Sequence, residues 1–412
     1  MIALRPIGYV IGLMVMTLGA AMLIPMLADI LDPRGDWRTF AASAFFTVLA
    51  GAVLTLTCAS SRTGSLDLRQ TFILTTSVWL ALPFFGAVPF VIGELEASAT
   101  DAFFEAMSGL TTTGSTVFTG LDDLSWGTNL WRGMLQWFGG IGIIVVAMVF
   151  LPTLRVGGMQ VFRSEGFDTF GKILPRAAEI AKSISAIYVG LTGACFLAYS
   201  WAGMPYLDAV VHAMTTIATG GFSSHDASFG VFGPATEYVA VCFMLIASLP
   251  FVRYVQLVAG TARPLVHDSQ VRTFFGIVLA VVLTLTAWLI LQRGWGGEEA
   301  FRKALFNGTS ILTGTGYASA DYGLWGTFPV TLMFMIGLVG GCAGSTCCSI
   351  KVFRFQLLWA AVVTQIRQIS SPRGVFTLRF SGGGSGLVAT TRSAPSQSTS
   401  RAGTLSATAP ST

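Results

Sequence analysis

Apolar runs long enough to cross a lipid bilayer recur along most of this 412-residue chain and constrain its fold more than any other feature. A transmembrane helix needs about 20 predominantly apolar residues. Only 11% of the residues are charged, whereas a soluble domain carries about a quarter. We therefore expect an all-α polytopic membrane protein, with spans at 7–31, 39–59, 69–93, 130–152, 182–203, 235–259, 270–292 and 328–341.

Four segments depart from this simple pattern. The last expected span, 328–341, is too short to cross alone, so we expect it to continue into 350–369 after an interruption. Three further segments of moderate hydrophobicity, 99–116, 205–222 and 299–317, lie between long spans and end in Gly and Thr. Each is too short for a full crossing, which is typical of a re-entrant segment.

Basic and acidic residues alternate between successive connections, which predicts the orientation. One set of connections contains Arg62, Arg69, Arg155, Arg163, Lys172, Arg176, Lys182, Arg263, Arg272, Lys351, Arg354, Arg367 and Arg373. The opposite set is rich in Asp and Glu. The positive-inside rule places the basic set and the N-terminus in the cytoplasm, so the three short segments enter from the outer side. The first apolar run has no small-residue cleavage site after it, and we expect a retained helix rather than a signal peptide.

The three short segments are copies of one unit. Residues 102–114 (AFFEAMSGLTTTG), 209–221 (AVVHAMTTIATGG) and 304–316 (ALFNGTSILTGTG) align without a gap. Each copy predicts a short amphipathic helix that ends in a Thr/Gly stretch and has a span on both sides. The repeating unit is therefore helix, pore loop, helix.

This unit has the properties of a cation filter. Non-helical backbone at membrane depth is tolerated where it lines a cavity or is buried in protein. Glycine allows the backbone to turn carbonyl oxygens inward, and such carbonyls replace the hydration shell of a monovalent cation. An ordinary loop or tight helix packing would explain one such stretch, but three in register favour a filter. The candidate filter residues are Thr111, Thr112, Thr113, Gly114, Ala218, Thr219, Gly220, Gly221, Thr313, Gly314, Thr315 and Gly316.

Four motifs carry a resemblance to a known family: 111–117 (TTTGSTV), 216–226 (TIATGGFSSHD), 313–322 (TGTGYASADY) and 340–346 (GGCAGST). They resemble the Trk/Ktr/HKT superfamily, most closely its bacterial Trk-type potassium uptake membrane subunits, from about residue 1 to 375. The resemblance implies that Gly114, Gly221 and Gly316 are the filter glycines. It also implies potassium selectivity over sodium, because Gly rather than Ser stands at position 114.

The interrupted last span is the second candidate site. The resemblance implies that this stretch is an intramembrane gate below the filter; a close helix-packing patch of small residues is the alternative. The family often has Gly-Gly where this chain has Cys347, Cys348 and Ser349. The candidate gate residues are Gly340, Gly341, Ala343, Gly344, Ser345, Thr346 and Lys351.

Other polar residues are weaker candidates. Arg253 could contact a gate or partner, or extend its charged end to the membrane interface. We expect His212 to be a hydrogen-bonding residue of its short helix rather than a proton relay. His225 and Asp226 could attract cations or belong to a solvated loop. The sequence has no nucleophile elbow, phosphate loop or metal-ligand cluster, and the cysteine spacing favours neither disulfides nor zinc, so we do not expect an enzyme.

The expected organisation has five parts: two N-terminal helices (1–62), three pore repeats (63–160, 161–262 and 263–375) and a low-complexity tail (376–412). The tail is rich in Ser, Thr, Ala and Pro, a composition typical of disorder. Family members have a fourth pore repeat at this point, and we expect it to be missing here.

The resemblance also implies a function. We expect uptake of potassium across the bacterial inner membrane, with K+ as the transported ion and with possible proton or sodium symport. A homodimer in the lipid bilayer and a cytoplasmic, TrkA-like nucleotide-binding regulatory subunit are the implied partners. No organic cofactor and no nucleic acid are expected. The alternative is a non-conducting scaffold that lacks the fourth quadrant of the filter.

Overall fold

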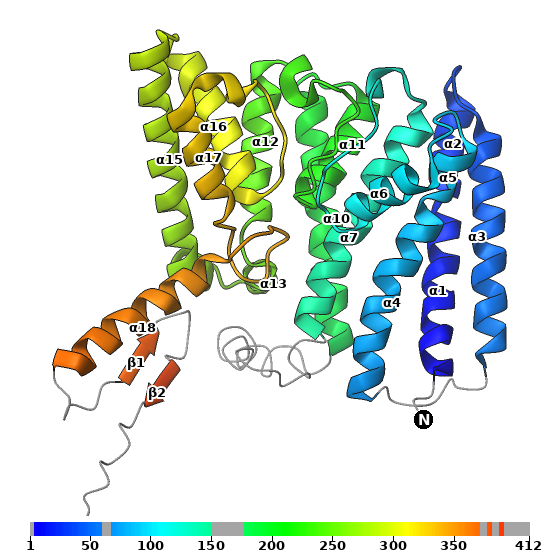
Figure 1. Cartoon of the computed structure of the whole chain (residues 1–412), viewed down its shortest axis with the longest axis horizontal. Helices are drawn as coiled ribbons and strands as arrows, with labels where there is room; N and C mark the ends of the chain where they lie inside the picture. Colours follow the sequence, from blue (N-terminus) through cyan, green and yellow to red (C-terminus); the bar gives the residue numbers. More distant parts are fainter. Residues whose placement is uncertain (1–3, 60–66, 150–176, 371–376, 381–386, 391–412) are drawn as a thin grey trace, which may run out of the picture.

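The computed structural model describes residues 4–59, 67–149, 177–370, 377–380 and 387–390. These residues form a helical bundle in which the helices α6, α11 and α16 lie between longer helices (Figure 1). The first part of the bundle consists of α1 (Arg5–Ala21), α2 (Leu23–Leu31), α3 (Trp37–Thr57), α4 (Leu68–Gly86), α5 (Val88–Ile92), α6 (Ala99–Leu110), η2 (Leu121–Asp123) and α7 (Trp126–Val149).

The remaining elements follow the same order of long and short helices. They are α10 (Ala177–Trp201), α11 (Tyr206–Ile217), η5 (Ser228–Val231), α12 (Pro234–Ala247), α13 (Phe251–Val258), α14 (Arg263–Val266), α15 (Ser269–Arg293), α16 (Gly297–Thr313), η6 (Tyr322–Trp325), α17 (Thr327–Gly337) and α18 (Val352–Ser370).

Long apolar helices confirm the expected multi-pass membrane protein. Within the described ranges, five helical stretches have the length and composition to span a membrane: Arg5–Leu31, Trp37–Thr57, Arg69–Ile92, Ala181–Trp201 and Ser269–Arg293. Large apolar side chains such as Phe45, Leu197 and Leu291 are more than 60% exposed on them. Apolar surface of this extent requires a hydrocarbon environment rather than water.

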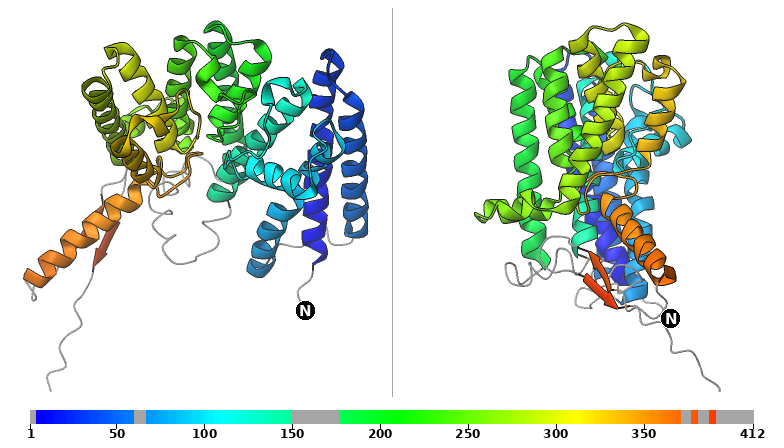
Figure 2. Two further views of the ribbon diagram at one scale, coloured as in Figure 1. Left: turned by 45° about the horizontal axis from the view of Figure 1, so that its top comes forward. Right: turned by 90° about the vertical axis from the view of Figure 1, so that its left-hand side faces the viewer.

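The expected continuous span 235–259 is wrong. Helix α12 ends at Ala247 and α13 begins at Phe251, and the two axes differ in direction by 90°. Pro250 occupies the break, and its ring nitrogen has no hydrogen with which to continue the helical ladder. The right-hand view of Figure 2 shows α13 extending sideways from the bundle.

Two large buried clusters form the core. One cluster surrounds α6 and α7, and the other surrounds α11, α16 and the helices that flank them. In the second cluster the rings of Phe229, Tyr317 and Phe306 meet, with centroid distances of 4.6 Å from Phe229 to Tyr317 and 5.0 Å from Phe229 to Phe306. The short helix α16 and the residues that follow it are therefore packed against the aromatic ring of Phe229.

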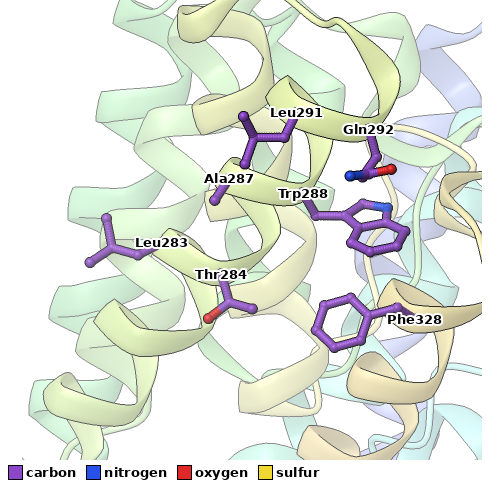
Figure 3. A pocket seen from close by; sticks show the side chains of 7 residues that line it. All are labelled: Leu283, Thr284, Ala287, Trp288, Leu291, Gln292 and Phe328. Carbon is purple, nitrogen blue, oxygen red and sulfur yellow. The ribbon is translucent and has the colours of Figure 1, made fainter.

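A shallow groove separates α15 from α17 on the outside of the bundle. In this groove the Trp288 ring lies next to Phe328, with a centroid distance of 4.9 Å, and its Nε1 donates a hydrogen bond to the Trp325 carbonyl (Figure 3). The groove is lined by Leu283, Thr284, Ala287, Trp288, Leu291, Gln292 and Phe328. Tryptophan with an apolar ring and a satisfied N–H is typical of a membrane interface.

Part of the tail that the sequence predicts to be disordered has regular structure. Strands β1 (Thr377–Phe380) and β2 (Leu387–Thr390) pair in antiparallel register, with Phe380 opposite Leu387. Both strands contain apolar and β-branched residues, which favour pairing over a solvated chain. The rest of the tail lies outside the described residues, and the expected division into repeats stays a prediction.

Candidate functional site

The three Thr/Gly segments, 111–114, 218–221 and 313–316, begin where the short helices α6, α11 and α16 end. Their backbones share one geometry. The second residue of each segment has a positive φ of 54°, 50° or 72°, in the order Thr112, Thr219 and Gly314. The fourth residue also has a positive φ, of 78°, 82° or 88°, in the order Gly114, Gly221 and Gly316.

Positive φ is costly for a residue with a side chain, so this repeated pattern reflects a backbone that the surroundings enforce. The same hydrogen bond recurs in all three segments. The N–H of the third residue donates over 2.9 Å to a carbonyl five residues earlier, in the pairs Thr113 to Ser108, Gly220 to Thr215 and Thr315 to Ser310. The alignment of the three copies therefore describes a structural equivalence.

Neighbouring segments touch through their backbones. A Cβ atom added to Gly114 would lie 2.0 Å from the carbonyl oxygen of Gly220, and one added to Gly221 would lie 1.9 Å from that of Thr315. Only glycine fits at these two positions. At Gly316 an added Cβ would meet no atom of the described residues within 4 Å. The second segment thus lies between the first and the third.

One polar side chain from each short helix holds the chain that leaves its Thr/Gly segment. Glu105 accepts hydrogen bonds from the Thr116 hydroxyl over 2.8 Å and from the Val117 N–H over 3.1 Å. In the second copy His212 Nε2 lies 3.0 Å from the Ser223 hydroxyl, and in the third Asn307 bonds to Ser319. These three residues align in the sequence, and the expected hydrogen-bonding role of His212 is confirmed.

Arg132 on α7 connects the first and second copies. Its guanidinium donates to Glu105 over 2.9 Å and to the Ser223 carbonyl over 2.7 Å, and its Cζ lies 4.5 Å from the centre of the Phe222 ring. The Arg132 side chain is only 1% exposed. Its charge is therefore compensated by a buried carboxylate, a carbonyl and an aromatic face.

Gln136, one turn further along α7, holds the second segment directly. Its Nε2 donates to the Gly220 carbonyl over 2.6 Å, and its Oε1 accepts from the Phe222 N–H over 3.0 Å. A Cβ on Gly220 would lie 2.4 Å from the Gln136 side chain, so the amide and the glycine fit each other. Gln136 and Arg132 were not among the predicted site residues, although a polar residue inside an apolar run is a signal for such a role.

The surroundings of the three segments are polar without fixed charge. No charged residue occurs within 111–117, 218–224 or 313–320. The C-terminal ends of α6, α11 and α16, which carry partial negative charge, meet these segments. Backbone carbonyls combined with helix ends favour a weakly hydrated monovalent cation over an anion.

The interrupted stretch, hereafter the loop 338–351, lies between α17 and α18. Its two ends are held together, because Gly340 N–H donates to the Ile350 carbonyl over 2.9 Å and Ile350 N–H donates to the Leu338 carbonyl over 3.2 Å. A Cβ on Gly340 would lie 2.0 Å from the Cys348 carbonyl oxygen, so glycine is required there. The predicted interruption of the last span is therefore confirmed, with a closed loop in place of a helix.

The loop 338–351 packs on the bend between α12 and α13. The Ser248 carbonyl accepts from the Cys342 N–H over 3.0 Å, and the Phe251 N–H donates to the Gly344 carbonyl over 3.0 Å. The Cys347 thiol also donates to the Ser248 hydroxyl over 2.9 Å. The bend between α12 and α13 leaves these backbone groups without helical hydrogen-bond partners, and the loop supplies the missing partners. The two irregular stretches complete each other's hydrogen bonds.

The loop also reaches the third Thr/Gly segment. Cys348 Sγ lies 3.8 Å from the Gly314 carbonyl oxygen. Lys351, the last residue of the loop, donates a hydrogen bond from its ammonium group to the Cys347 carbonyl. The remaining predicted residues Gly341, Ala343, Ser345 and Thr346 belong to the same packed loop, where Thr346 donates to the Ala247 carbonyl over 3.1 Å.

Arg253 lies near this loop but is not an interfacial side chain with an exposed charged end. It is 5% exposed, and its guanidinium donates to Asp268 over 2.9 Å and 3.0 Å. Gln270, two residues after Asp268, accepts a hydrogen bond from the Ala343 N–H over 3.0 Å. Arg253 therefore fixes the start of α15, which in turn contacts the loop.

His225 and Asp226 join the loops that follow the first two Thr/Gly segments, and Asp226 is exposed there. The Asp226 carboxylate accepts from the N–H groups of Gly120 and Leu121 over 2.8 Å and 3.1 Å. His225 contacts Asp208 at 3.3 Å and Asp122 through Nδ1. The hydrogen bonds to Asp208 and then to Asp122 raise the pKa of His225 to about 9.

The described residues contain no group of three or more His, Cys, Asp or Glu side chains that could hold a metal ion.

Residues 37–384 match the TrkH family, described as cation transport proteins. The Trk system potassium uptake protein TrkI of Halomonas elongata is 41% identical over 91% of this chain and 76% of its own length. TrkH of Escherichia coli K12 is 37% identical over 91% of this chain and 79% of its own length. The crystal structure of the potassium transporter TrkH from Vibrio parahaemolyticus superposes with a TM-score of 0.83 at 35% identity, covering 93% of this chain and 80% of that one.

Proposed function

Because the chain belongs to the TrkH family of cation transport proteins, we propose that it takes up potassium ions as the membrane subunit of a Trk-type system. The observation that carries this proposal is the shared geometry of three Thr/Gly segments whose backbones touch edge to edge. In this proposal residues 111–114, 218–221 and 313–316 are the selectivity filter. Potassium is the transported ion, and no organic cofactor takes part.

The alternation of φ supports a carbonyl-lined path. In each filter segment the second and fourth residues have positive φ, while the preceding helix ends at the first residue or directly before it. A chain in which φ alternates between negative and positive values can turn successive carbonyl groups to one side. Carbonyl oxygens arranged in this way replace the water around a cation. The absence of charged residues from the segments keeps binding weak enough for release.

The loop 338–351 is the proposed gate. Its Cys348 side chain lies against Gly314 in the third filter segment, and its backbone is bonded to the bend between α12 and α13. A change in the angle of that bend would move the loop relative to the filter. This makes the loop a gate that two helices control, with Lys351 at its cytoplasmic end.

The orientation and partners belong to the same proposal. Placing the exposed basic residues Arg263, Arg272, Arg354 and Arg367 in the cytoplasm gives a cytoplasmic N-terminus in the bacterial inner membrane. A TrkA-like nucleotide-binding subunit would dock on this basic surface, and a homodimer would present α15 and its neighbours to lipid or to the second copy. Coupling to protons or sodium would set the direction of transport.

A second function is favoured by one observation. Gly114 and Gly221 each contact the next filter segment, whereas no described residue fills the space next to Gly316. A chain whose filter stays open on that side would act as a non-conducting scaffold. The two functions differ in one measurable quantity, which is cation flux.

The test is flux of radioactive rubidium into proteoliposomes that contain the full chain, with sodium as the competing ion. We expect saturable uptake that excess potassium inhibits and sodium does not. Gly114→Ser and Gly316→Ser should weaken this discrimination, because a side chain distorts a positive-φ position of the filter. Gly120→Ser is the matched control, since Gly120 has φ of 72° and no described atom within 4 Å of an added Cβ.

Unchanged selectivity in both filter variants would refute the filter assignment. Absence of flux from a protein that keeps its fold would favour the scaffold.

A further inference from the structure

Tyr317 directly follows the third Thr/Gly segment, and its side chain reaches into the second copy. The side chain is fully buried, and the centre of its ring lies 4.6 Å from that of Phe229. Its hydroxyl oxygen lies 2.5 Å from the Thr215 hydroxyl and 3.1 Å from the Thr216 hydroxyl, both on α11. One phenol group therefore bonds the third copy to the helix that leads into the second Thr/Gly segment.

A comparison of the three copies shows that Thr215 has a different partner from its two equivalents. Ser108, Thr215 and Ser310 occupy the same place in the aligned copies. The Ser108 hydroxyl donates to the Ser115 carbonyl over 2.6 Å, and the Ser310 hydroxyl donates to the Tyr317 carbonyl over 2.7 Å. Each serine thus holds the residue that follows its own Thr/Gly segment. The Thr215 hydroxyl instead contacts Tyr317 of the next copy and carbonyl groups of its own helix.

The hydroxyl groups around Tyr317 form one continuous chain. Tyr199 on α10 extends it, because its hydroxyl oxygen lies 2.8 Å from that of Thr216. If each hydroxyl donates one hydrogen, donation runs from Tyr199 to Thr216 and on to Tyr317. Tyr317 then donates to Thr215, which donates to the Val211 carbonyl over 3.0 Å. All four hydroxyl-bearing residues are fully buried, and a satisfied network of this kind holds its members in one arrangement.

The second Thr/Gly segment is therefore held from both sides. From the first copy, Gln136 bonds to the Gly220 carbonyl. From the third copy, the close contact between Gly221 and the Thr315 carbonyl limits how near the two segments can come. The hydroxyl bonds of Tyr317 limit how far the same two segments can move relative to each other.

From this arrangement we propose that Tyr317 is a specificity-determining positioning residue, whose hydroxyl holds the second and third filter segments at the spacing that suits potassium rather than sodium. The inference rests on the proposed function. A smaller ion such as sodium needs the carbonyl oxygens of the filter to move inward. Movement of the third segment relative to the second would break the bonds of the Tyr317 hydroxyl, so these bonds oppose the accommodation of sodium.

Tyr317→Phe tests the proposal, because it removes the hydroxyl and leaves the ring in place. Rubidium flux is measured in proteoliposomes that contain the full chain, with potassium and with sodium as competing ions. The ratio of the sodium and potassium concentrations that halve the flux measures selectivity. We expect this ratio to fall by about fivefold, which is the effect of one typical hydrogen bond that is kept with potassium and lost with sodium.

Tyr188→Phe is the matched control. Tyr188 is also a fully buried tyrosine, and its hydroxyl donates to the Trp137 carbonyl of α7 over 3.1 Å. Both variants lose one buried hydroxyl and should lose thermal stability to a similar extent, but only Tyr317→Phe should lose selectivity. Lower stability with unchanged selectivity in Tyr317→Phe would show a purely structural role and would overturn the proposal.

The partner hydroxyl is tested in the same assay. Thr215→Val keeps the shape of the side chain without its hydroxyl, and it should lower the selectivity ratio as Tyr317→Phe does. The double variant should show little further loss, because both changes remove the same bond. Thr215→Ser keeps a hydroxyl and should keep selectivity. A double variant whose loss is the full product of the two single losses would overturn the assigned bond.

Thermal unfolding in detergent reads the same inference without flux. A bound ion raises the unfolding midpoint, so the unaltered protein should have a higher midpoint in potassium chloride than in sodium chloride at equal concentration. This difference should shrink in Tyr317→Phe and persist in Tyr188→Phe. If the unaltered protein carries no flux but the difference shrinks in Tyr317→Phe, the inference stands and the proposed transport function fails. No difference in the unaltered protein, or an equal one in Tyr317→Phe, would overturn the inference.

Discussion

The Nε atom of Arg132 lies 2.9 Å from the carboxylate oxygen Oε1 of Glu105, and both side chains are almost completely buried. Glu105 also accepts hydrogen bonds from Thr116 and Val117, shortly after the first Thr/Gly segment. Arg132 reaches the Ser223 carbonyl, directly after the second. This one ion pair therefore connects the residues that follow two of the Thr/Gly segments.

We predict that breaking this pair destabilises the protein. Glu105→Gln should lower the unfolding free energy by about 3–5 kcal/mol, because Arg132 then remains buried without a counter-charge. The midpoint of thermal unfolding in detergent measures this change. Asp101→Asn is the control, since Asp101 is exposed at the start of the same helix. Replacing both partners, in Glu105→Leu with Arg132→Met, should recover part of the loss. A single variant as stable as Asp101→Asn would contradict the prediction.

The filter glycines should differ in their tolerance of a side chain. Gly221→Ala places a Cβ against the Thr315 carbonyl at 1.9 Å, whereas Gly316→Ala meets no described atom within 4 Å. Gly316→Ala should therefore cost only the penalty of a positive φ, about 1–2 kcal/mol. Gly221→Ala should cost clearly more, because the backbones must also separate. Thermal unfolding of the two purified variants compares them, and equal losses would mean that the segments are not in contact.

Gln136 should act as a positioning residue for the second filter segment. Gln136→Leu leaves the Gly220 carbonyl and the Phe222 N–H without their partner, at a cost of about 1–3 kcal/mol for each buried group. Potassium selectivity should fall together with stability, because the segment loses the side chain that fixes it. Gln292→Leu, in the exposed groove between α15 and α17, is the matched control. Selectivity that survives in Gln136→Leu would show that the filter is held by its own backbone.

The contacts of His225 predict a dependence of stability on pH. Its folded pKa of about 9 lies above the ordinary value of 6.5 for histidine. The stabilisation is therefore complete below about pH 6.5 and is lost as pH rises through about 9. Asp122 is half exposed, so after allowance for solvent screening we expect only about 1–2 kcal/mol.

The unfolding midpoint measured between pH 6 and pH 10 tests this dependence. In His225→Gln the difference across this range should shrink, because the side chain no longer carries a charge. An identical pH profile for His225→Gln would assign the dependence to other groups.

Much of the membrane architecture was predictable, because its causes are local. Apolar runs of spanning length follow from the need to bury side chains in lipid, and α1 to α4, α10 and α15 lie where those runs predict them. The equivalence of the three short segments was visible because Glu105, His212 and Asn307 align and each segment ends in Thr and Gly. The bend at Pro250 was missed, since an apolar run containing one proline also fits a kinked span.

By itself the sequence determined that this chain is a multi-pass membrane protein with three equivalent Thr/Gly segments. Hydropathy and a gapless repeat are properties of neighbouring residues, so no contact is needed to recognise them. Only the tertiary structure decided that Gly114 meets Gly220, that Arg132 joins two copies and that the Cys348 thiol occupies the space next to Gly314. These contacts join residues far apart along the chain, and their geometry depends on how the whole bundle packs.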